Sequence, residues 1–496
     1  MSTPLSVAIV GGGFGGIGTA ITLRQRGTED LLVFERGERL GGVWQHNTYP
    51  GIACDVPSHL YSYSFARNPQ WKRRYSPGDQ IREYLEDCTR RFGVEDAVRT
   101  GVDVTAAVWD EARALWHITT SDGDYDAKVL VTACGQLSEP SIPTVEGIER
   151  FAGPAFHSAR WRDDIDLTGL RVAVVGTGAS AIQFVPAIAP LVKQMHVFQR
   201  SAPWIIPKGD RAYAPWENHL FERLPVRQVA SRFANWAFFE AAAPGFVDHR
   251  WLLRPIAAAN AALLRRQVAD PVLREQLRPT DEIGCKRLLV SNDWYPTFTR
   301  PNVELVTDGV AQVTETSIIG RDGIEREVDV IVFGTGFNAN GFVAPMQVTG
   351  RSGANLADVW DPLPQAYLGT AVSGFPNLFM LYGPNTNMGA GSAIFLLESQ
   401  MRHVAQAVGL LRRTRGRSLE VRPEAQVAFN QEMRDRLARS VWESGCSNWY
   451  VDEQGHDTSN WPGTMTEFRR RSAKVSLDDY RLELAPVEQR PLAPPV

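Results

Sequence analysis

The chain has 496 residues, a length that predicts several domain-sized units instead of one small domain. Hydrophobic residues make up 44% and charged residues 22%, which are ordinary values for a soluble globular protein with a packed core. The formal net charge is only −4, so nothing in the composition indicates a polyanionic partner. These values argue against a nucleic-acid binder, a disordered scaffold and a collagen-like fibre.

The start of the chain and its apolar runs bear on its location. The first strand is expected to begin near Val7, which leaves no room for the charged and apolar segments of a secretory signal. No apolar run reaches the roughly 20 residues that a transmembrane helix needs. The nearest approach, residues 233–247, is interrupted by polar residues and a proline. We therefore expect a cytoplasmic protein without a transmembrane segment.

The cysteines and histidines show no disulfide or metal pattern. The five cysteines are an odd number and form no C-x-x-C pair, which argues against a disulfide framework, a redox dithiol and a zinc knuckle. We expect reduced thiols, buried or partly buried. The nine histidines lack H-x-H and H-E-x-x-H spacing, so we predict no metal site. The cysteines are Cys54, Cys88, Cys134, Cys285 and Cys446.

The amino-terminal segment has a glycine motif between two apolar runs. Residues 7–10 are predicted to form a buried strand, and Gly11, Gly13 and Gly16 follow with G-x-G-x-x-G spacing. A helical stretch and a second apolar run, which ends at Glu35, come next. The first glycine permits a tight turn, the second lets a pyrophosphate approach the backbone, and the third lets helix and strand pack closely. The helix N-terminus then offers free N–H groups to the phosphates.

The same unit occurs a second time. Residues 172–175 form the apolar run, and Gly176, Gly178 and Ala181 follow at the same spacing, with alanine in the tolerated third position. A helical stretch and the run 196–200 complete the unit. One such motif is weak evidence, but the strand, turn, helix and strand context occurs twice here, which makes it strong. The alternative is a parallel-sheet domain that binds no nucleotide.

The residues that close the two units indicate different nucleotides. Glu35 can accept hydrogen bonds from ribose hydroxyls and would repel a 2′-phosphate. The same count from Gly176 leads to Arg200, next to Ser201, and a guanidinium favours a 2′-phosphate. Aligning the strand ends instead pairs Glu35 with Gln199, and Arg200 can alternatively be a solvated surface charge. We interpret the first unit as an FAD site and the second as an NADPH site.

These units define the expected fold class and domains. We predict an α/β protein with two Rossmann-like dinucleotide-binding domains, for FAD and NADPH, and a helical insertion. Apolar runs at 129–135 and 330–337 end in small residues, as where a chain passes between nucleotide domains. The expected bounds are 1–140 for the first part of the FAD domain, 141–333 for the NADPH domain, 334–484 for the returning FAD part with active-site loops, and 485–496 for a Pro-rich tail.

The insertion, at about 205–280, does not follow the doubly wound pattern. Its segment 233–266 is rich in Ala, Leu, Trp and Phe with interspersed Arg, and is predicted to be helical. It can cap the active site or touch a membrane surface. The cap interpretation is favoured because basic residues are sparse.

A block before the second unit carries a family resemblance. Phe151-x-Gly153-x-x-x-His157-x-x-x-Trp161, together with both glycine motifs, resembles the fingerprint of Baeyer–Villiger monooxygenases, which belong to the class B flavin-containing monooxygenases. Trp161 favours this branch over the heteroatom oxygenases, whereas Arg162 departs from the usual Pro or Asp. His157 is interpreted as a residue that orients the joint between the domains.

Further segments resemble the same family. Gly41–Trp44 resembles the G-G-x-W segment that packs along the flavin in this family, and Tyr61 resembles a further residue that contacts the flavin. The remaining similar segments are the loop Tyr49–Asp55 near the flavin and nicotinamide, the pair Lys286-Arg287, the return segment Tyr382–Asn385 and the late active-site loop Asn448–Tyr450, whose Trp449 covers bound NADP.

The resemblance implies a reaction and residue roles. NADPH reduces FAD, and the reduced flavin and dioxygen form a flavin peroxide that attacks a ketone to give an ester or lactone. Arg287 would stabilise the peroxide anion and the tetrahedral oxyanion because arginine stays charged, and Asp55 would hold its rotamer. Lys286 would lie near the NADPH phosphate. Asp55 and Arg287 can alternatively be a structural ion pair.

Three other functions stay open from the residues. The first is a flavin monooxygenase that oxidises sulfur or nitrogen of a small apolar substrate, in which a positioned guanidinium matters less. The second is a flavin disulfide reductase, against which the absence of a redox Cys pair argues. The third is a flavin-binding protein without turnover.

Overall fold

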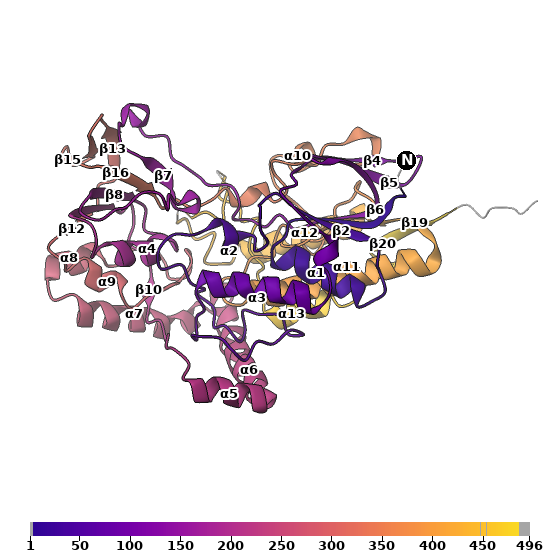
Figure 1. Ribbon diagram of the computed structural model, residues 1–496, viewed down its shortest axis with the longest axis horizontal. Helices are drawn as coiled ribbons and strands as arrows, with labels where there is room; N and C mark the ends of the chain where they lie inside the picture. Colours follow the sequence, from indigo (N-terminus) through magenta and orange to yellow (C-terminus); the bar gives the residue numbers. More distant parts are fainter. Residues whose placement is uncertain (1–2, 447, 453, 486–496) are drawn as a thin grey trace, which may run out of the picture.

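The computed structural model describes residues 3–446, 448–452 and 454–485. Most of the predicted tail, 486–496, lies outside these residues. Two sheets form the centres of two lobes, and Figure 1 shows the second sheet on the left, the first on the right and helices α5 and α6 projecting below. The predicted α/β class with two Rossmann-like units therefore has its counterpart in two separate sheets.

The first sheet has the order β17-β4-β5-β6-β1-β2-β3, and β18 pairs with the free edge of β6. Strands β6, β1, β2 and β3 are parallel neighbours, and β4 and β5 extend the sheet as an antiparallel meander. Apolar residues fill β1, since a strand in the middle of a parallel sheet is buried on both faces. The strands are β1 (Leu5–Val10), β2 (Leu31–Glu35), β3 (Val98–Thr100), β4 (Val104–Asp110), β5 (Leu115–Thr120), β6 (Gly123–Thr132), β17 (Gln347–Thr349) and β18 (Leu378–Met380).

The second sheet is parallel throughout, in the order β12-β9-β8-β16-β7. Its central strand β8 follows β7, the strand of the family-like block, and β16 returns between them. The strands are β7 (Ala155–His157), β8 (Arg171–Val175), β9 (Gln194–Phe198), β12 (Val303–Val306) and β16 (Val330–Phe333).

Smaller sheets complete the strand inventory of the described residues. One is antiparallel, β13-β14-β15, and two are two-stranded, β10-β11 and β19-β20. Their strands are β10 (Ile205–Ile206), β11 (Leu289–Val290), β13 (Val310–Val313), β14 (Ser317–Gly320), β15 (Glu325–Glu327), β19 (Gly416–Val421) and β20 (Tyr480–Leu484).

Helices cover both sheets. Helix α1 packs against the long helix α11, and α4 packs against α9 beside the second sheet. Helices α5 to α8 fall between residues 205 and 280, where the helical insertion is predicted, although the domain bounds themselves stay predictions. The helices are α1 (Phe14–Arg24), α2 (Val43–His46), α3 (Gly78–Arg91), α4 (Ala181–Ile188), α5 (Pro215–Arg223), α6 (Pro225–Ala242), α7 (Arg254–Gln267), α8 (Pro271–Gln276), α9 (Trp294–Thr297), α10 (Leu356–Val359), α11 (Ala393–Thr414), α12 (Pro423–Leu437) and α13 (Met465–Arg471).

The apolar cores follow this division. Each sheet separates two clusters of buried side chains, one on either face. A further cluster joins the end of α6 to α12, α13 and the late loop that contains Trp442 and Tyr450. The insertion is thus anchored to the returning part of the chain and not only to the second sheet.

The cysteines correct one prediction. Cys54, Cys88 and Cys134 are free, but Cys285 and Cys446 form a disulfide across 161 positions of sequence, so the expectation of five reduced thiols is wrong for this pair. Counting and spacing cannot reveal a contact that the fold creates between distant segments. Within the described ranges, no three His, Cys, Asp or Glu side chains gather as metal ligands, and no helix is long and apolar enough to cross a membrane.

Candidate active site

The first glycine turn brings three backbone segments together. Gly11 has a φ of +110°, and a Cβ there would stand 2.4 Å from the carbonyl oxygen of Ala133, which follows β6. A Cβ on Gly16 would stand 1.8 Å from the oxygen of Gly11, so only glycine lets α1 approach the turn. Gly13 is the N-cap of α1 and faces Gly42, where a Cβ would stand 3.5 Å from the Gly42 Cα. The first N–H groups of α1 have no partner within the helix, which leaves them for a phosphate.

Glu35 lies at the end of β2 with its carboxylate beneath this turn. Its Oε2 accepts a 2.6 Å hydrogen bond from the N–H of Gly12, and its Oε1 accepts a 2.7 Å bond from the N–H of Gly37. Only 4% of the residue is exposed. The structure thus places the predicted acid at the turn, and its contact with a ribose stays a prediction.

The second glycine turn repeats the first. Gly176 has a φ of +109°, and a Cβ there would stand 2.4 Å from the oxygen of Gly334, which follows β16. Ala181 is fully buried as the first residue of α4. A Cβ on Gly178 would have only one atom within 4 Å, the Gly334 oxygen at 3.9 Å, so this position is open toward a ligand.

The strand registers decide which residue corresponds to Glu35. Phe34 pairs with Val10 in the first unit and Phe198 pairs with Val175 in the second, so the residue after each pair is Glu35 and Gln199. Gln199 is buried and donates from Nε2 to the carbonyl of Gln276 over 2.8 Å. The spatial equivalent is therefore Gln199, and Arg200 is the exposed residue that follows it.

Beside Arg200 lies a polar cluster that holds Lys286. Its Nζ donates to Ser201 Oγ over 2.7 Å and to Asp281 Oδ2 over 2.5 Å. Thr177, in the second glycine turn, donates to the carbonyl of Ser201 over 3.3 Å. The predicted residues Ser201 and Lys286 are thus brought together at this turn, and Asp281 is a partner that sequence reasoning missed.

The loop Tyr49–Asp55 bridges the two units. Gln183 of α4 accepts a 2.7 Å hydrogen bond from the N–H of Ala53 through Oε1, and its backbone carbonyl oxygen would stand 2.9 Å from a Cβ on Gly51. Burial raises the pKa of Tyr49 to about 12, so its hydroxyl keeps its proton. The loop follows the first unit in sequence but rests on the helix of the second, which places Asp55 between them.

Asp55 binds Arg287, as the family resemblance predicts. Asp55 Oδ2 accepts from Nε of Arg287 over 2.8 Å and from Nη2 over 2.6 Å. About a third of the Arg287 side chain, 34%, stays exposed. Asp55, despite the opposing cost of burial, holds the pKa of Arg287 above its usual range, with Tyr450 and Tyr382 contributing in the same direction. The guanidinium is charged at any working pH.

A chain of buried hydrogen bonds runs away from this pair. Tyr382 Oη donates to Asn387 Oδ1 over 2.8 Å, Asn387 Nδ2 donates to Asn460 Oδ1 over 2.7 Å, and Asn460 Nδ2 donates to Asp457 Oδ2 over 2.6 Å. Burial raises the pKa of Asp457 to about 7, although three donors favour its charged form. Sequence reasoning found Tyr382 but not its partners, because Asp457 and Asn460 lie 75 and 78 positions further along the chain and no motif indicates Asn387.

The late loop reaches the same region. The ring of Trp449 lies 4.2 Å from that of Tyr450, whose side chain is buried beside Arg287. Cys446, three positions before Trp449, is joined to Cys285, two positions before Arg287. The disulfide therefore ties the loop predicted to cover NADP to the segment that carries Arg287.

The predicted flavin contacts lie together on the first unit. Trp44 in α2 donates from Nε1 to the hydroxyl of Tyr61 over 3.1 Å, and the two rings meet edge to face at 5.7 Å. Tyr61 also packs against Phe14 at the start of α1. Gln136, three positions after the Ala133 that adjoins the first glycine turn, is 3% exposed and has no hydrogen-bond partner for either side-chain amide atom among the described residues. A buried amide without partners fits a site whose ligand supplies hydrogen bonds.

His157, which the sequence predicts to orient the joint between the domains, lies beside Phe337, a few positions after β16. It ends β7 at the edge of the second sheet, accepts a 3.1 Å hydrogen bond at Nδ1 from the N–H of Ala159, and packs edge to face on Phe337. Burial lowers its pKa to about 4, so the ring is neutral near pH 7. A neutral, buried ring suits packing at the joint better than proton transfer.

The comparisons with known proteins fit this geometry. Residues 8–234 match the family model for pyridine nucleotide-disulphide oxidoreductases. A Baeyer–Villiger monooxygenase of Pseudomonas aeruginosa is 42% identical over 484 residues, covering 97% of this chain and 92% of that protein. One from Streptomyces coelicolor is 41% identical over 478 residues, with 96% and 92% coverage.

The chain belongs to the family of Baeyer–Villiger monooxygenases. Solved structures agree with this assignment. The structure of cyclohexanone monooxygenase from Rhodococcus sp. Phi1 bound to NADP+ has a TM-score of 0.88 at 28% sequence identity, and the match covers 98% of this chain and 100% of that chain. Steroid monooxygenase bound to NADP has a TM-score of 0.87 at 30% identity, with 97% and 100% coverage. The predicted family, fold class and enzyme class, a flavoprotein monooxygenase, are confirmed.

The family match also weakens the disulfide reductase alternative. The region matched by the oxidoreductase model, 8–234, contains Cys54, Cys88 and Cys134, and all three are free. The disulfide between Cys285 and Cys446 lies outside that region. The match therefore reflects the nucleotide-binding fold and not a redox dithiol.

Proposed function

We propose that this protein uses FAD and NADPH to insert one oxygen atom of dioxygen into a ketone, with an ester or lactone as product. The observation that carries the proposal is Arg287, which Asp55 holds through two hydrogen bonds where the two nucleotide units meet. When bound, FAD accepts hydride from NADPH and activates dioxygen, and the protein supplies binding, orientation and charge.

The residues present suit both cofactors. The first glycine turn and Glu35 would hold the pyrophosphate and ribose of FAD, with Trp44 and Tyr61 along the flavin and the free amide of Gln136 near it. The second turn would hold the pyrophosphate of NADPH, with its 2′-phosphate near the basic residues described next.

Two cations would recognise the 2′-phosphate: Arg200, which is exposed, and Lys286, which hydrogen bonds hold in place. Arg200 is exposed and has no ion pair among the described residues, so its five donors are available to a phosphate. Lys286 is fixed by Ser201 and Asp281, and Asp281 lowers the net positive charge that a phosphate meets there. We infer that Arg200 contributes most of the preference for NADPH over NADH.

Arg287 is placed to stabilise negative charge on oxygen. Asp55 occupies Nε and Nη2 through a single carboxylate oxygen, and among the described residues no acceptor binds Nη1. The remaining N–H groups of the guanidinium are therefore available to bind the oxyanion that forms as the ketone carbonyl is attacked. Asp55 is thus a positioning residue, and Tyr450 and Trp449 close the site from the late loop and exclude water.

Replacing Arg287 tests this role. Arg287→Ala should keep bound FAD and NADPH oxidation but lose about 10²–10³-fold in ester formation, because one preorganised charge is removed. Arg287→Lys, which keeps the charge without the fork, should fall between. Both are measured by product analysis with linear, cyclic and aryl ketones under labelled dioxygen.

The same assay separates the alternatives. A sulfide offered beside the ketones should be a poorer substrate, and its oxidation should depend less on Arg287. Undiminished ester formation by Arg287→Ala would contradict the proposed role. Sulfoxide as the sole product of the wild-type enzyme would favour the heteroatom oxygenase, and tight FAD binding without NADPH oxidation would favour a flavin-binding protein without turnover.

A further inference from the structure

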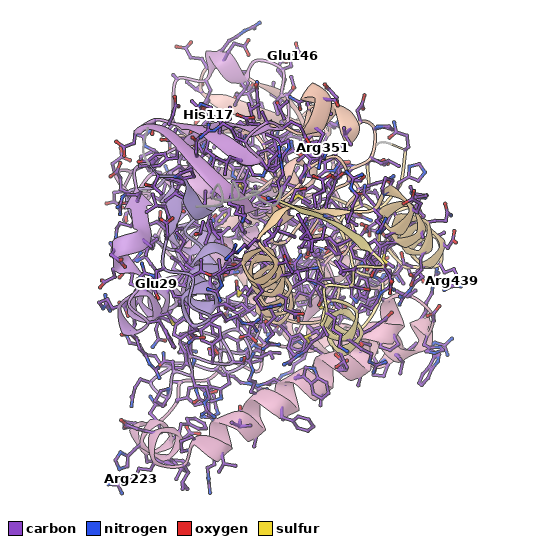
Figure 2. The ribbon with its side chains drawn as sticks, turned by 90° about the vertical axis from the view of Figure 1, so that its right-hand side faces the viewer. Glu29, His117, Glu146, Arg223, Arg351 and Arg439 are labelled. Carbon is purple, nitrogen blue, oxygen red and sulfur yellow. A yellow bond between two sulfur atoms is a disulfide. The ribbon has the colours of Figure 1, made fainter. Side chains whose placement is uncertain are left out.

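Helix α6 (Pro225–Ala242) has its polar and apolar sides reversed relative to an ordinary surface helix. Figure 2 shows it running along the lower edge of the molecule away from Arg223, which labels the outer tip of the α5–α6 pair. A surface helix normally buries its apolar stripe and exposes its charges. Here the side facing the body carries most of the polar residues, and the side facing solvent is almost entirely apolar.

The inner side binds the body through polar contacts. Arg232 donates from Nη1 to the carbonyl oxygens of His59, Leu60 and Ser62, over 2.8 to 3.3 Å. Ser231 forms a 2.8 Å hydrogen bond with Nδ1 of His59. Further along, Trp236 and Phe239 pack at the edge of two apolar clusters, and the carboxylate of Glu240 accepts from the N–H of Thr466 over 3.0 Å. The orientation of α6 is therefore fixed by many independent contacts.

The outer side has no partner in the described chain. Val226, Phe233 and Phe238 are 68%, 62% and 63% exposed. Arg227 is the only charged residue among the exposed positions of the helix, and no acidic residue is exposed there. Spacings of three and four residues make these positions one continuous face. The exposed positions are Pro225, Val226, Arg227, Val229, Ala230, Phe233, Ala234, Phe238 and Ala241.

The charges beside this face select its partner. Arg223, at the end of α5, and Arg227 are exposed, and no carboxylate lies within salt-bridge distance of either among the described residues. A second copy of the chain docked face to face through α6 would bring such arginines together, and the exposed acid beside them, Glu222, already accepts a 3.3 Å hydrogen bond from Nε2 of Gln70. An anionic lipid surface supplies both an apolar layer and the opposite charge. The exposed Trp216 of α5 adds an aromatic ring of the type that favours membrane interfaces.

We propose that the exposed face of α6 (called the α6 face below) docks the enzyme on the surface of an anionic lipid bilayer, as a peripheral contact that does not span it. The inner side of the same helix rests on residues 59–62, which include the predicted flavin contact Tyr61. The cap interpretation and the membrane contact are thus compatible, since they use opposite sides of one helix. The inference does not depend on which substrate is oxidised.

Vesicle binding by the full-length holoenzyme tests the proposal. We expect the protein to float with vesicles of equal parts phosphatidylcholine and phosphatidylglycerol, and to bind less at high salt or to phosphatidylcholine alone. The double variant Phe233→Ser/Phe238→Ser should bind at least about tenfold more weakly, because two rings no longer enter the interface. Arg227→Glu should weaken binding to the anionic vesicles specifically.

A matched control removes apolar surface elsewhere. Val427→Ser/Leu477→Ser replaces two side chains that are 62% and 50% exposed outside the α6 face, and should bind vesicles like the wild type. FAD content and thermal unfolding, measured for every variant, identify any that is misfolded. No binding to the anionic vesicles by the wild type would overturn the proposal. So would equal loss in both double variants, or a concentration-dependent dimer that Phe233→Ser/Phe238→Ser abolishes, which would assign the face to a second copy.

Discussion

The two nucleotide units are near copies in backbone and different in chemistry. In each, the first glycine donates its N–H to the carbonyl of a phenylalanine in the last two positions of the neighbouring strand, Phe34 at 2.7 Å and Phe198 at 3.0 Å. In each, a Cβ on that glycine would stand 2.4 Å from the carbonyl after the other neighbouring strand. The next residue after the phenylalanine differs: Glu35 in one unit, Gln199 in the other. We infer that the shared frame would hold a pyrophosphate and that the side chains at its rim would select the nucleotide.

We infer that the charge that selects the nucleotide lies one position later in the second unit. Glu35 is buried and accepts from the N–H of Gly12 in the turn and from that of Gly37 after β2, so the acid is hydrogen-bonded to the turn itself. Gln199 is equally buried but bonds to Gln276, and the cation is displaced to the exposed Arg200. A 2′-phosphate needs more room than a hydroxyl, and a charge at the surface leaves that room.

The largest expected difference between the units concerns the third position of the glycine motif, which is Gly16 in the first unit and Ala181 in the second. Gly16→Ala should abolish FAD retention, because the new Cβ would overlap the Gly11 oxygen, at 1.8 Å. The second unit already has Ala181 at this position. Flavin absorbance after purification measures the effect, and normal FAD content in the variant would show that the two turns have the same tolerance.

A fall in pH should lower the stability of both lobes by similar amounts. Burial lowers the pKa of His157, at the edge of the second sheet, and of His403, in the helix packed on α1, to about 4 each. An unfolded histidine has a pKa of about 6.5, so below that pH the unfolded state binds more protons than the folded state. Each site then loses up to about 3 kcal/mol of stability as the pH falls from about 6.5 to 4.

Hydrogen exchange by segment at pH 7 and pH 5 checks this expectation. Because amide exchange is intrinsically slower at pH 5, the two conditions are compared through protection factors, in which the intrinsic rate is divided out. Protection factors should fall in both lobes at pH 5, and His157→Asn should reduce the pH dependence of the second sheet alone. A pH effect confined to one lobe would indicate that the other histidine is not buried as a neutral ring in solution.

Arg200→Ala should change nucleotide preference more moderately. We expect the KM for NADPH to rise about 10- to 100-fold with little change for NADH, because one charge-assisted contact to the 2′-phosphate is lost. Gln199→Ala is the matched control, since its side chain bonds to the protein and should alter both nucleotides alike. Equal effects of Arg200→Ala on NADPH and NADH would remove it from the phosphate site.

The reciprocal change should have the smallest effect. Ala181→Gly restores the third glycine to the second unit, where α4 begins. We expect a loss of about 0.5–1 kcal/mol in stability from the extra backbone freedom and no loss of NADPH use. Thermal unfolding and NADPH kinetics measure both, and a large change in KM would mean that the alanine itself shapes the site.

The sequence predicts those features that short-range constraints determine. Both glycine turns, their strands and the pair Asp55–Arg287 follow from motifs in which each residue type has a local or family-specific reason. The register, in contrast, assigns Gln199 and not Arg200 as the counterpart of Glu35, because one residue of uncertainty in a strand end cannot be removed by counting.

Contacts between distant segments were out of reach. Nothing in the sequence pairs Gln199 with Gln276, 77 positions later, and Cys285 finds Cys446 only through the fold. The segment predicted to be helical, 233–266, includes only the second half of α6, and its pattern does not tell which side meets the body, since hydrophobicity alone would bury the wrong one. Long-range partners, and not elements, are what the structure adds.

The disulfide closes a covalent ring through the molecule. The polypeptide from Cys285 to Cys446 includes the last strands of the second sheet, the returning strands of the first and helix α11. A single cleavage of the backbone inside that ring would leave one connected molecule, which would separate into two fragments only after a reductant is added. The disulfide would therefore hold the two fragments together after a cut in the backbone between Cys285 and Cys446.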